Sequence, residues 1–347
     1  MLVTCSCAAS AAVGSSQCGI WLRRTNGRWI MSVTRWADDR PAQVIWLDWD
    51  DYLAWLAGKL RRTTTAWGET VRLGPPAAPG EHEVYVGPTG EGKSTHVIGR
   101  LGLRKYVLAL DAKGEDETLG RSGYVRVSSI YEDSIKWKMR HRDDARAWDH
   151  IWQQVDDGQP ARVIVGGPAD DDSQFARLKA LMLDAVNFCR YTRGWTLYCD
   201  EFEVLSSQEM FNLRATINHA LITARTRGIS VLTCYQAQAW VSKHAVRQCQ
   251  RATVWRTGDR QLIKNIAEGM GRDWHEVAAA IDQLPQWHTV TIPRGPNSGP
   301  MVITHAPKLG AKTRSQTSGR QGQDSRRGGH GTGQQPAGGV AQPQSRG

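Results

Sequence analysis

From residue 82 onward, short apolar runs alternate with amphipathic stretches. The runs predict strands at 82–86, 105–110, 124–127, 161–165, 195–199, 229–234, 252–256 and 288–292. Apolar residues at helical spacing predict helices from residue 93 and at 144–155, 173–190, 208–225 and 261–269. Strands alternating with helices predict an α/β fold with a mainly parallel central sheet covered on both faces.

The segments before and after this alternating region have other sequence patterns. Residues 44–60 predict one helix packed on the main domain, because Ile45, Trp49 and Tyr52 follow helical spacing; a partner-binding helix is the alternative. Residues after 293 are rich in Gly, Gln, Ser and Arg and predict disorder. The predicted organisation is a disordered or mis-started leader (1–30), an N-terminal helical segment with a Thr/Pro/Gly-rich linker (31–80), the main domain (81–292) and a disordered basic tail (293–347).

Composition narrows the function classes. The net charge of +10 lies mostly at the ends, since the tail after Pro307 holds seven Lys and Arg against Asp324. Global basicity is therefore weak support for a nucleic-acid partner. No apolar run is long enough for a membrane span, and the first residues lack a charged region before their apolar part. Seven scattered cysteines without a C-x-x-C pair predict a reduced, cytoplasmic protein.

The first predicted strand runs into a phosphate-binding loop. Residues 87–94 read G-P-T-G-E-G-K-S, which fits G-x-x-x-x-G-K-[ST] between a strand and a helix. Gly87, Gly90 and Gly92 are expected to take positive φ and to let the backbone approach phosphate, Lys93 to contact the β- and γ-phosphates, and Ser94 to ligate Mg²⁺. The predicted binding set is Gly87, Pro88, Thr89, Gly90, Glu91, Gly92, Lys93, Ser94 and Thr95. A chance Gly-rich turn is the competing interpretation.

A pair of acids follows the strand predicted at 195–199. Asp200 and Glu201 form a Walker B pattern, in which Asp200 holds Mg²⁺ through water and Glu201 activates the attacking water. Solvated acids at a strand end are the alternative. The upstream phosphate loop favours catalysis.

Two further residues suit a nucleotide-hydrolysing ring. Gln236 ends the strand predicted beside the phosphate loop and is placed to sense a γ-phosphate. Arg225 precedes that strand and is placed to reach a neighbouring subunit's nucleotide, with Arg227 as the second candidate. Each alone is more commonly an ordinary surface residue.

Together these motifs resemble the FtsK–HerA family of hexameric DNA-pumping ATPases. The matching stretches are D-E at 200–201, A-R-T-R-G-I at 224–229, C-Y-Q at 234–236 and D-A-K-G at 111–114. The sequence departs from the family pattern at Ala224 and at Cys234-Tyr235. The resemblance implies a RecA-like P-loop domain, ATP and Mg²⁺ as cofactors, a homo-hexameric ring, DNA bound without sequence specificity, and partner proteins of conjugation or packaging.

Candidate DNA contacts are basic. They comprise Lys136, Lys138, Arg140 and Arg142, a second group of Lys243, His244, Arg247 and Arg251, and the tail. A solvated surface is the competing interpretation. Two other functions stay open: a GTPase or small-molecule kinase, although no N-K-x-D follows the loop, and a non-motor ATP switch that controls assembly.

Overall fold

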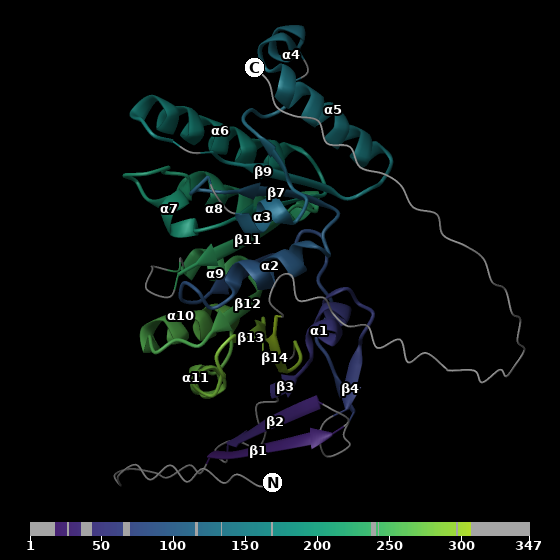
Figure 1. Cartoon of the computed structure of the whole chain (residues 1–347). Coiled ribbons are helices and arrows are strands. Elements are labelled where there is room, and N and C mark those ends of the chain that lie inside the picture. Colours follow the sequence, from purple (N-terminus) through teal and green to yellow (C-terminus); the bar gives the residue numbers. More distant parts are fainter. Residues whose placement is uncertain are drawn as a thin grey trace, which may run out of the picture. The chain divides into compact units, whose positions relative to one another are not determined.

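The computed structural model is drawn in Figure 1 and describes residues 18–25, 28–35, 44–64, 70–114, 117–132, 134–167, 169–236, 241, 243–295 and 298–306. Its core is a ten-stranded sheet of order β3-β14-β13-β12-β6-β11-β10-β7-β9-β8. The strands are β3 (Val44–Trp46), β6 (His82–Val86), β7 (Tyr106–Leu110), β8 (Val125–Val127), β9 (Ala161–Val165), β10 (Trp195–Cys199), β11 (Ser230–Tyr235), β12 (Cys249–Trp255), β13 (His288–Pro293) and β14 (Met301–His305). Within this sheet, as far as the structure describes it, only the β12–β13 and β13–β14 pairs are antiparallel, which confirms the predicted α/β class.

Helices cover both faces of this sheet (Figure 1). They are α1 (Trp49–Leu56), α2 (Lys93–Leu101), α3 (Glu117–Arg121), α4 (Ile135–Arg140), α5 (Arg142–Asp156), α6 (Asp172–Tyr191), α7 (Phe202–Ser206), α8 (Arg214–Thr223), α9 (Lys243–Gln248), α10 (Arg260–Met270) and α11 (Trp274–Asp282), with the 3-10 turn η1 (Arg225–Arg227). Val84 and Val86 of β6 face one core with α6 and α8, whereas Tyr85 between them faces α2 and α3. The period-2 alternation of side chains along β6 therefore supplies both cores.

Most predicted elements are found within a residue or two. Strand β6 and helix α2 begin at the predicted residues, and β10 has the predicted bounds. The predicted helix 208–225 is shorter, because α8 begins only at Arg214 after a turn that buries Phe211 and Leu213. Four short helices, α3, α4, α7 and α11, were not predicted.

The predicted N-terminal organisation is wrong in three places. Residues 44–46 form strand β3, so the apolar run that resembled the front of one helix pairs with β14 instead. The stretch taken as linker contains a hairpin of β4 (Arg62–Thr64) and β5 (Thr70–Arg72). The predicted leader of residues 1–30 contains the whole of strand β1 (Cys18–Thr25) and the start of its antiparallel partner β2 (Arg28–Arg35). Residues 1–17 lie outside the described residues.

The predicted end of the main domain at residue 292 is too early. Strand β14 lies beyond it and pairs antiparallel with β13 and parallel with β3. A Gly/Pro-rich stretch before Met301 concealed this strand in the sequence. The domain therefore includes β14, while residues 307–347 of the predicted tail lie outside the described residues.

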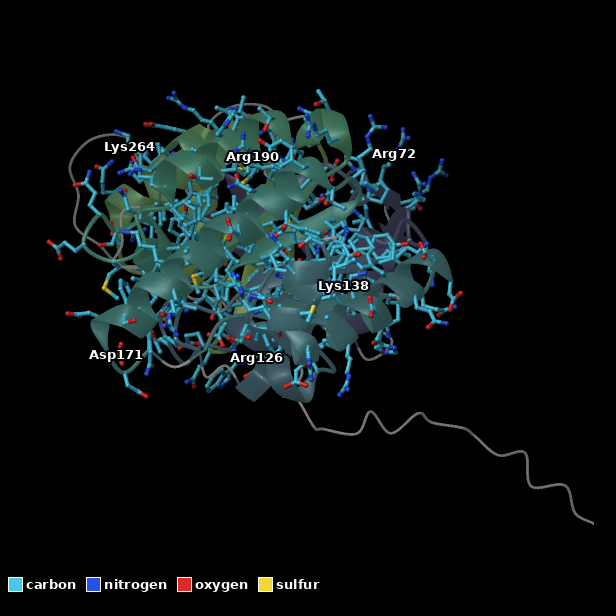
Figure 2. All side chains as sticks on the ribbon, turned by 90° about the horizontal axis from the view of Figure 1, so that it is seen from above. Arg72, Arg126, Lys138, Asp171, Arg190 and Lys264 are labelled. Carbon is cyan, nitrogen blue, oxygen red and sulfur yellow. The ribbon has the colours of Figure 1, made fainter. Side chains whose placement is uncertain are left out.

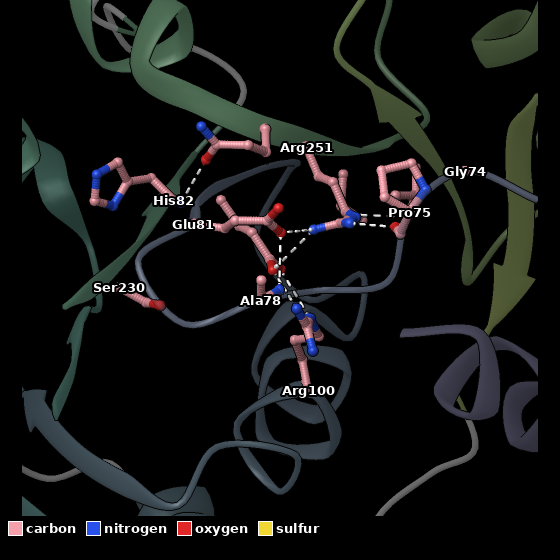
Figure 3. Close-up of polar contacts among 12 residues, drawn as sticks. Gly74, Pro75, Ala78, Glu81, His82, Arg100, Ser230 and Arg251 are labelled. Atoms are coloured by element: carbon pink, nitrogen blue, oxygen red, sulfur yellow. Dashed lines mark hydrogen bonds and ion pairs between the residues drawn. The ribbon is translucent and has the colours of Figure 1, made fainter. Parts of the chain in front are cut away.

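A buried ionic cluster fixes the approach to β6 (Figure 3). The Glu83 carboxylate is 3% exposed, pairs with Arg100 and Arg104, and lies 3.8 Å from the Arg251 guanidinium. Arg104 and Arg251 also donate to the carbonyls of Ala78 and Pro75, at 2.9 and 2.6 Å. The three guanidinium groups hold the pKa of Glu83 well below its usual range, although burial opposes this. The cluster thereby ties residues 73–81 to the sheet.

Two bulk predictions can be compared with the described residues. Cys189, Cys199, Cys234 and Cys249 are buried free thiols, as expected of a reduced protein. Among the described helices none combines the length and the apolar character that a bilayer crossing requires.

Candidate functional site

The carboxyl ends of β6, β11, β10 and β7 meet at one edge of the sheet, since these neighbouring strands are parallel. One strand, β11, separates the strand that enters the phosphate loop from the strand that ends in the acids. A pocket of about 650 Å³ lies at this edge. It is lined by Thr89, Gly90, Gly92, Lys93, Ser94, Thr95, Asp111, Lys113, Thr118, Asp200, Glu201 and Gln236. The fold thus brings most of the sequence-predicted site residues together.

The loop glycines serve two different needs. Gly90 and Gly92 have φ of 84° and 82°, in the left-handed region that favours glycine. Gly87 does not have positive φ. A Cβ there would lie 2.6 Å from the Cβ of Trp255 on β12, so close packing requires this glycine. The expectation of positive φ is therefore wrong for Gly87, and the group against which this glycine packs is a tryptophan.

Lys93 is folded back over its own loop. Its Nζ donates to the carbonyls of Gly87 and Pro88, at 2.7 and 2.8 Å. Partial burial lowers the pKa of Lys93, while nearby groups that include Asp200 and Glu201 act in the opposite direction. The ammonium is therefore held at the mouth of the phosphate loop and faces the acidic pair.

The donor set suits a magnesium ion. The Ser94 hydroxyl and the Asp200 carboxylate both line the pocket, and oxygen ligands of this kind are those that Mg²⁺ prefers. Tyr198, two residues earlier on β10, donates its hydroxyl to Asp200 Oδ1 at 2.9 Å. This bond orients the carboxylate.

Glu201 is the most constrained of the acids. Its φ of 49° is left-handed, which is uncommon for a residue with a side chain. Its Oε1 accepts a hydrogen bond from Gln236 Nε2 at 3.0 Å and forms an ion pair with Lys113. Gln236, which was predicted to sense a γ-phosphate, thus lines the pocket and contacts Glu201. Lys113 was part of the D-A-K-G stretch but had no predicted role.

A third acid, Glu203, was not predicted to belong to the site. Its Oε1 accepts the backbone N–H of Gln236, and burial raises its pKa to about 7. Glu201 adds to the increase, whereas the N–H bond and Lys93 oppose it. An acid two residues after the Walker B glutamate gave no signal in the sequence, because its partner comes from β11.

Some predicted residues lie outside the pocket lining. Pro88 contributes its carbonyl to Lys93. The Glu91 carboxylate turns outward and accepts the backbone N–H of Trp287 at 3.3 Å. Arg225 lies in η1, which precedes the first residue of β11, so it is at the opposite edge of the sheet from the pocket.

The two arginines of η1 differ in their surroundings. Arg227 donates to the carbonyl of Arg190 at 2.7 Å and lies over the ring of Tyr191. Arg225 is exposed and makes no ion pair or side-chain hydrogen bond with any other residue that the structure describes. The Arg225 backbone packs closely against Gly80, because a Cβ added to Gly80 would lie 2.9 Å from the Arg225 carbonyl oxygen.

The basic residues predicted to contact DNA have three kinds of surroundings: some are exposed, one lies over an aromatic ring and one is buried. Lys136, Arg140 and Arg142 are exposed around α4, next to the exposed apolar Ile135 and Met139. Lys138, labelled in Figure 2, instead lies over the ring of Tyr131 at 5.7 Å.

Arg251 is wrong as a DNA contact. It is 2% exposed and forms an ion pair with Glu81 at 2.7 Å. In the same group Arg247 is exposed. The side chains of Lys243 and His244, like the tail, lie outside what the structure describes.

Comparison with known proteins gives structural similarities. No protein-family model and no curated protein matches the chain. The genome packaging NTPase B204 of Sulfolobus turreted icosahedral virus 2 is 18% identical, with 67% of this chain and 98% of that chain covered and a TM-score of 0.43. VirB4 of Thermoanaerobacter pseudethanolicus is 11% identical (67% and 90% covered, TM-score 0.43), and the bacterial conjugative coupling protein TrwBdeltaN70 is 13% identical (67% and 86%, TM-score 0.41). The strand order and phosphate loop of this chain are those of an α/β P-loop fold.

Proposed function

We propose that the protein is an ATP-hydrolysing motor of FtsK–HerA type that moves DNA through a ring of identical subunits. One observation carries the ATPase part: Lys93 of the phosphate loop and the acids Asp200 and Glu201 line the same pocket at one edge of one sheet. The resemblance of the sequence motifs supplies the ring and the DNA.

Each side chain then has a stated task. Backbone N–H groups of residues 90–95 and the N-terminus of α2 hold the phosphates, and Lys93 exchanges its loop carbonyls for phosphate oxygens. Ser94 and Asp200 would hold Mg²⁺, which when bound neutralises charge on the phosphates. Glu201 takes the proton of the attacking water, and Gln236 orients it.

In the proposed ring, the neighbouring subunit supplies an arginine that a subunit cannot bring to its own pocket. Arg225 is too remote to reach the pocket of its own subunit, because it lies before β11 and the pocket lies after it. In a head-to-tail ring the same exposed arginine would meet the nucleotide of the adjacent subunit and stabilise the charge of the transition state.

The candidate contacts for DNA are exposed cations without a carboxylate partner among the described residues. Lys136, Arg140 and Arg142 extend from the α4 region, and phosphate contacts of this kind need no base recognition, as a motor requires. Conjugation, chromosome handling and genome packaging are the processes that such a motor serves.

The test is the steady-state ATPase rate with and without linear duplex DNA over a range of salt. We expect DNA to stimulate hydrolysis, and less so at higher salt. Lys93→Ala should abolish nucleotide binding, and Glu201→Gln should bind ATP with little hydrolysis. Turnover that is indifferent to DNA, with no DNA binding at low salt, would contradict a motor. Rapid hydrolysis by Glu201→Gln would remove the proposed base.

Competition between GTP and ATP for the pocket distinguishes a GTPase from the proposed ATPase. If GTP displaces bound ATP at equal concentration and is hydrolysed faster, the protein belongs to another class of P-loop enzyme. If nucleotide drives assembly with negligible turnover, the protein is an assembly switch.

A further inference from the structure

Lys113 projects into the pocket from a braced turn. Asp111, at the end of β7, accepts the backbone N–H of Gly114 at 3.0 Å through Oδ1. Its other oxygen pairs with Arg126 at 3.1 Å, and Arg126 also donates to the Gly166 carbonyl at 2.8 Å. The D-A-K-G turn is therefore fixed from two sides, whereas the Lys113 side chain is 64% exposed and can move.

The Glu201 side chain, unlike that of Lys113, is largely buried. Its carboxylate is 12% exposed, and Oε1 is shared by the Lys113 ammonium and the Gln236 amide. Because its backbone is left-handed, the side chain is aimed at these partners from the strand end. With Oε1 occupied by both partners, this carboxylate is less available to accept a hydrogen bond from the attacking water.

We propose that Lys113 is a positioning residue that responds to the terminal phosphate of a nucleoside triphosphate. In the absence of that phosphate Lys113 holds the Glu201 carboxylate. When a triphosphate occupies the pocket, the Lys113 ammonium moves to the γ-phosphate and Glu201 is released to accept the proton of the attacking water. A diphosphate leaves the Lys113–Glu201 pair intact.

Charge and reach favour this exchange. A terminal phosphate carries about two negative charges and three acceptor oxygens, against one charge on a carboxylate. The ion pair to Glu201 raises the pKa of Lys113, so the ammonium is present at any physiological pH. Lys113 and Lys93 line the same pocket, from β7 and from α2 respectively, so they can approach a terminal phosphate from different sides.

This inference rests on the proposed ATPase function and makes a distinct claim: Lys113 distinguishes triphosphate from diphosphate. The experiment measures the binding of ATPγS and of ADP to the full chain by calorimetry. For Lys113→Met we expect ATPγS affinity to fall about tenfold and ADP affinity to stay within about twofold, as befits one lost charge-assisted contact. Lys113→Arg should recover most of the ATPγS affinity.

A matched control lies at the other end of the same strand. Lys105 precedes β7 at the other edge of the sheet and is also exposed, with its Nζ over the ring of Tyr106. Lys105→Met should leave both affinities unchanged. If Lys113→Met keeps the parental ratio of ATPγS to ADP affinity, the proposal is wrong.

A second measurement tests the pairing with Glu201. In Glu201→Gln the lysine no longer has a carboxylate to hold, so ATPγS should bind several-fold more tightly. That gain should disappear in the Lys113→Met, Glu201→Gln double variant, because the two effects are coupled. An equal gain with and without Lys113 would overturn the proposal. If the unsubstituted chain binds neither nucleotide, the proposed function itself fails, and this outcome is distinct from an unchanged affinity ratio.

Discussion

The backbone N–H of Gln236 donates to Oε1 of Glu203 at 2.5 Å and so joins the end of β11 to the first turn of α7. Glu203 lies beside the acids of the pocket but is itself partly buried, and its pKa of about 7 is above its usual 4.5. The proton on this carboxyl therefore changes near neutral pH.

The first prediction concerns stability against pH. A carboxyl whose pKa is raised by folding stabilises the protein fully below its unfolded pKa, and that contribution is lost as pH rises through about 7. Glu203→Gln keeps the acceptor and removes the charge. Its free energy of unfolding in urea should exceed that of the parent by on the order of 1 kcal/mol at pH 8, and the difference should vanish near pH 4.

Glu209, exposed on the following turn, provides the control. Glu209→Gln should give the same difference from the parent at both pH values. A pH-independent difference for Glu203→Gln would contradict the assignment of the titration to this residue.

The second prediction concerns Gly87. A Cβ at this position would meet Trp255 at 2.6 Å, so Gly87→Ala must displace the phosphate loop or β12. We expect a loss of about 1–3 kcal/mol in stability and weaker nucleotide binding. Gly120→Ala is the control, because that glycine lies in α3 with nothing within 4 Å of an added Cβ. Thermal unfolding and ADP titration of both variants measure the effect; equal behaviour would count against the packing argument.

The third prediction concerns the buried cluster around Glu83. Glu83→Gln leaves Arg100, Arg104 and Arg251 buried without their shared carboxylate, which should cost about 3–5 kcal/mol of unfolding free energy. Asp282→Asn breaks the exposed pair with Arg260 and should cost less than about 1 kcal/mol. Urea denaturation gives both values. A Glu83→Gln protein within 1 kcal/mol of the parent would mean that the cluster is not held by this charge.

The fourth prediction concerns the arginine of η1. Arg225→Ala should lower ATPase activity at least about tenfold, and only in the assembled ring, as expected for a transition-state contact from a neighbour. Mixing it with Glu201→Gln should restore activity, because some interfaces then combine an intact Arg225 with an intact Glu201.

Arg227→Ala and Arg193→Ala are the comparisons for this experiment. Arg227 is engaged by Arg190 and Tyr191, and Arg193 is exposed in the loop before β10, so neither should show recovery on mixing. Recovery with Arg227→Ala instead would move the role to that residue.

Local pattern predicted the interior of the sheet well. Strand β7, for example, is buried from Val107 to Leu110 and therefore reads as a continuous apolar run. The strands near one side of the sheet, β3 and β14, were harder to predict. Val44–Trp46 merged with the helix that follows it, because a strand of three residues carries little periodicity of its own. Strand β14 was missed because a Gly/Pro-rich stretch precedes it and resembles the start of the tail.

The site divides in the same way. Lys93 and Glu201 were predicted because they belong to short continuous motifs, in which the spacing of the residues along the sequence identifies the site. Lys113 and Glu203 acquire their roles from partners on other strands, which spacing does not encode. Arg251 shows the converse error: a cation in a basic stretch is buried against carboxylates that come from β6 and the segment before it.

The position of β6 has a consequence for synthesis on the ribosome. This strand and its phosphate loop leave the exit tunnel early, yet their sheet neighbours β11 and β12 are translated much later. Until then the nascent loop has neither Trp255 to pack on nor Glu201 to face. Non-local pairing of this kind is slow to form, so the newly made chain should gain nucleotide affinity in a single late step, after most of its length has emerged.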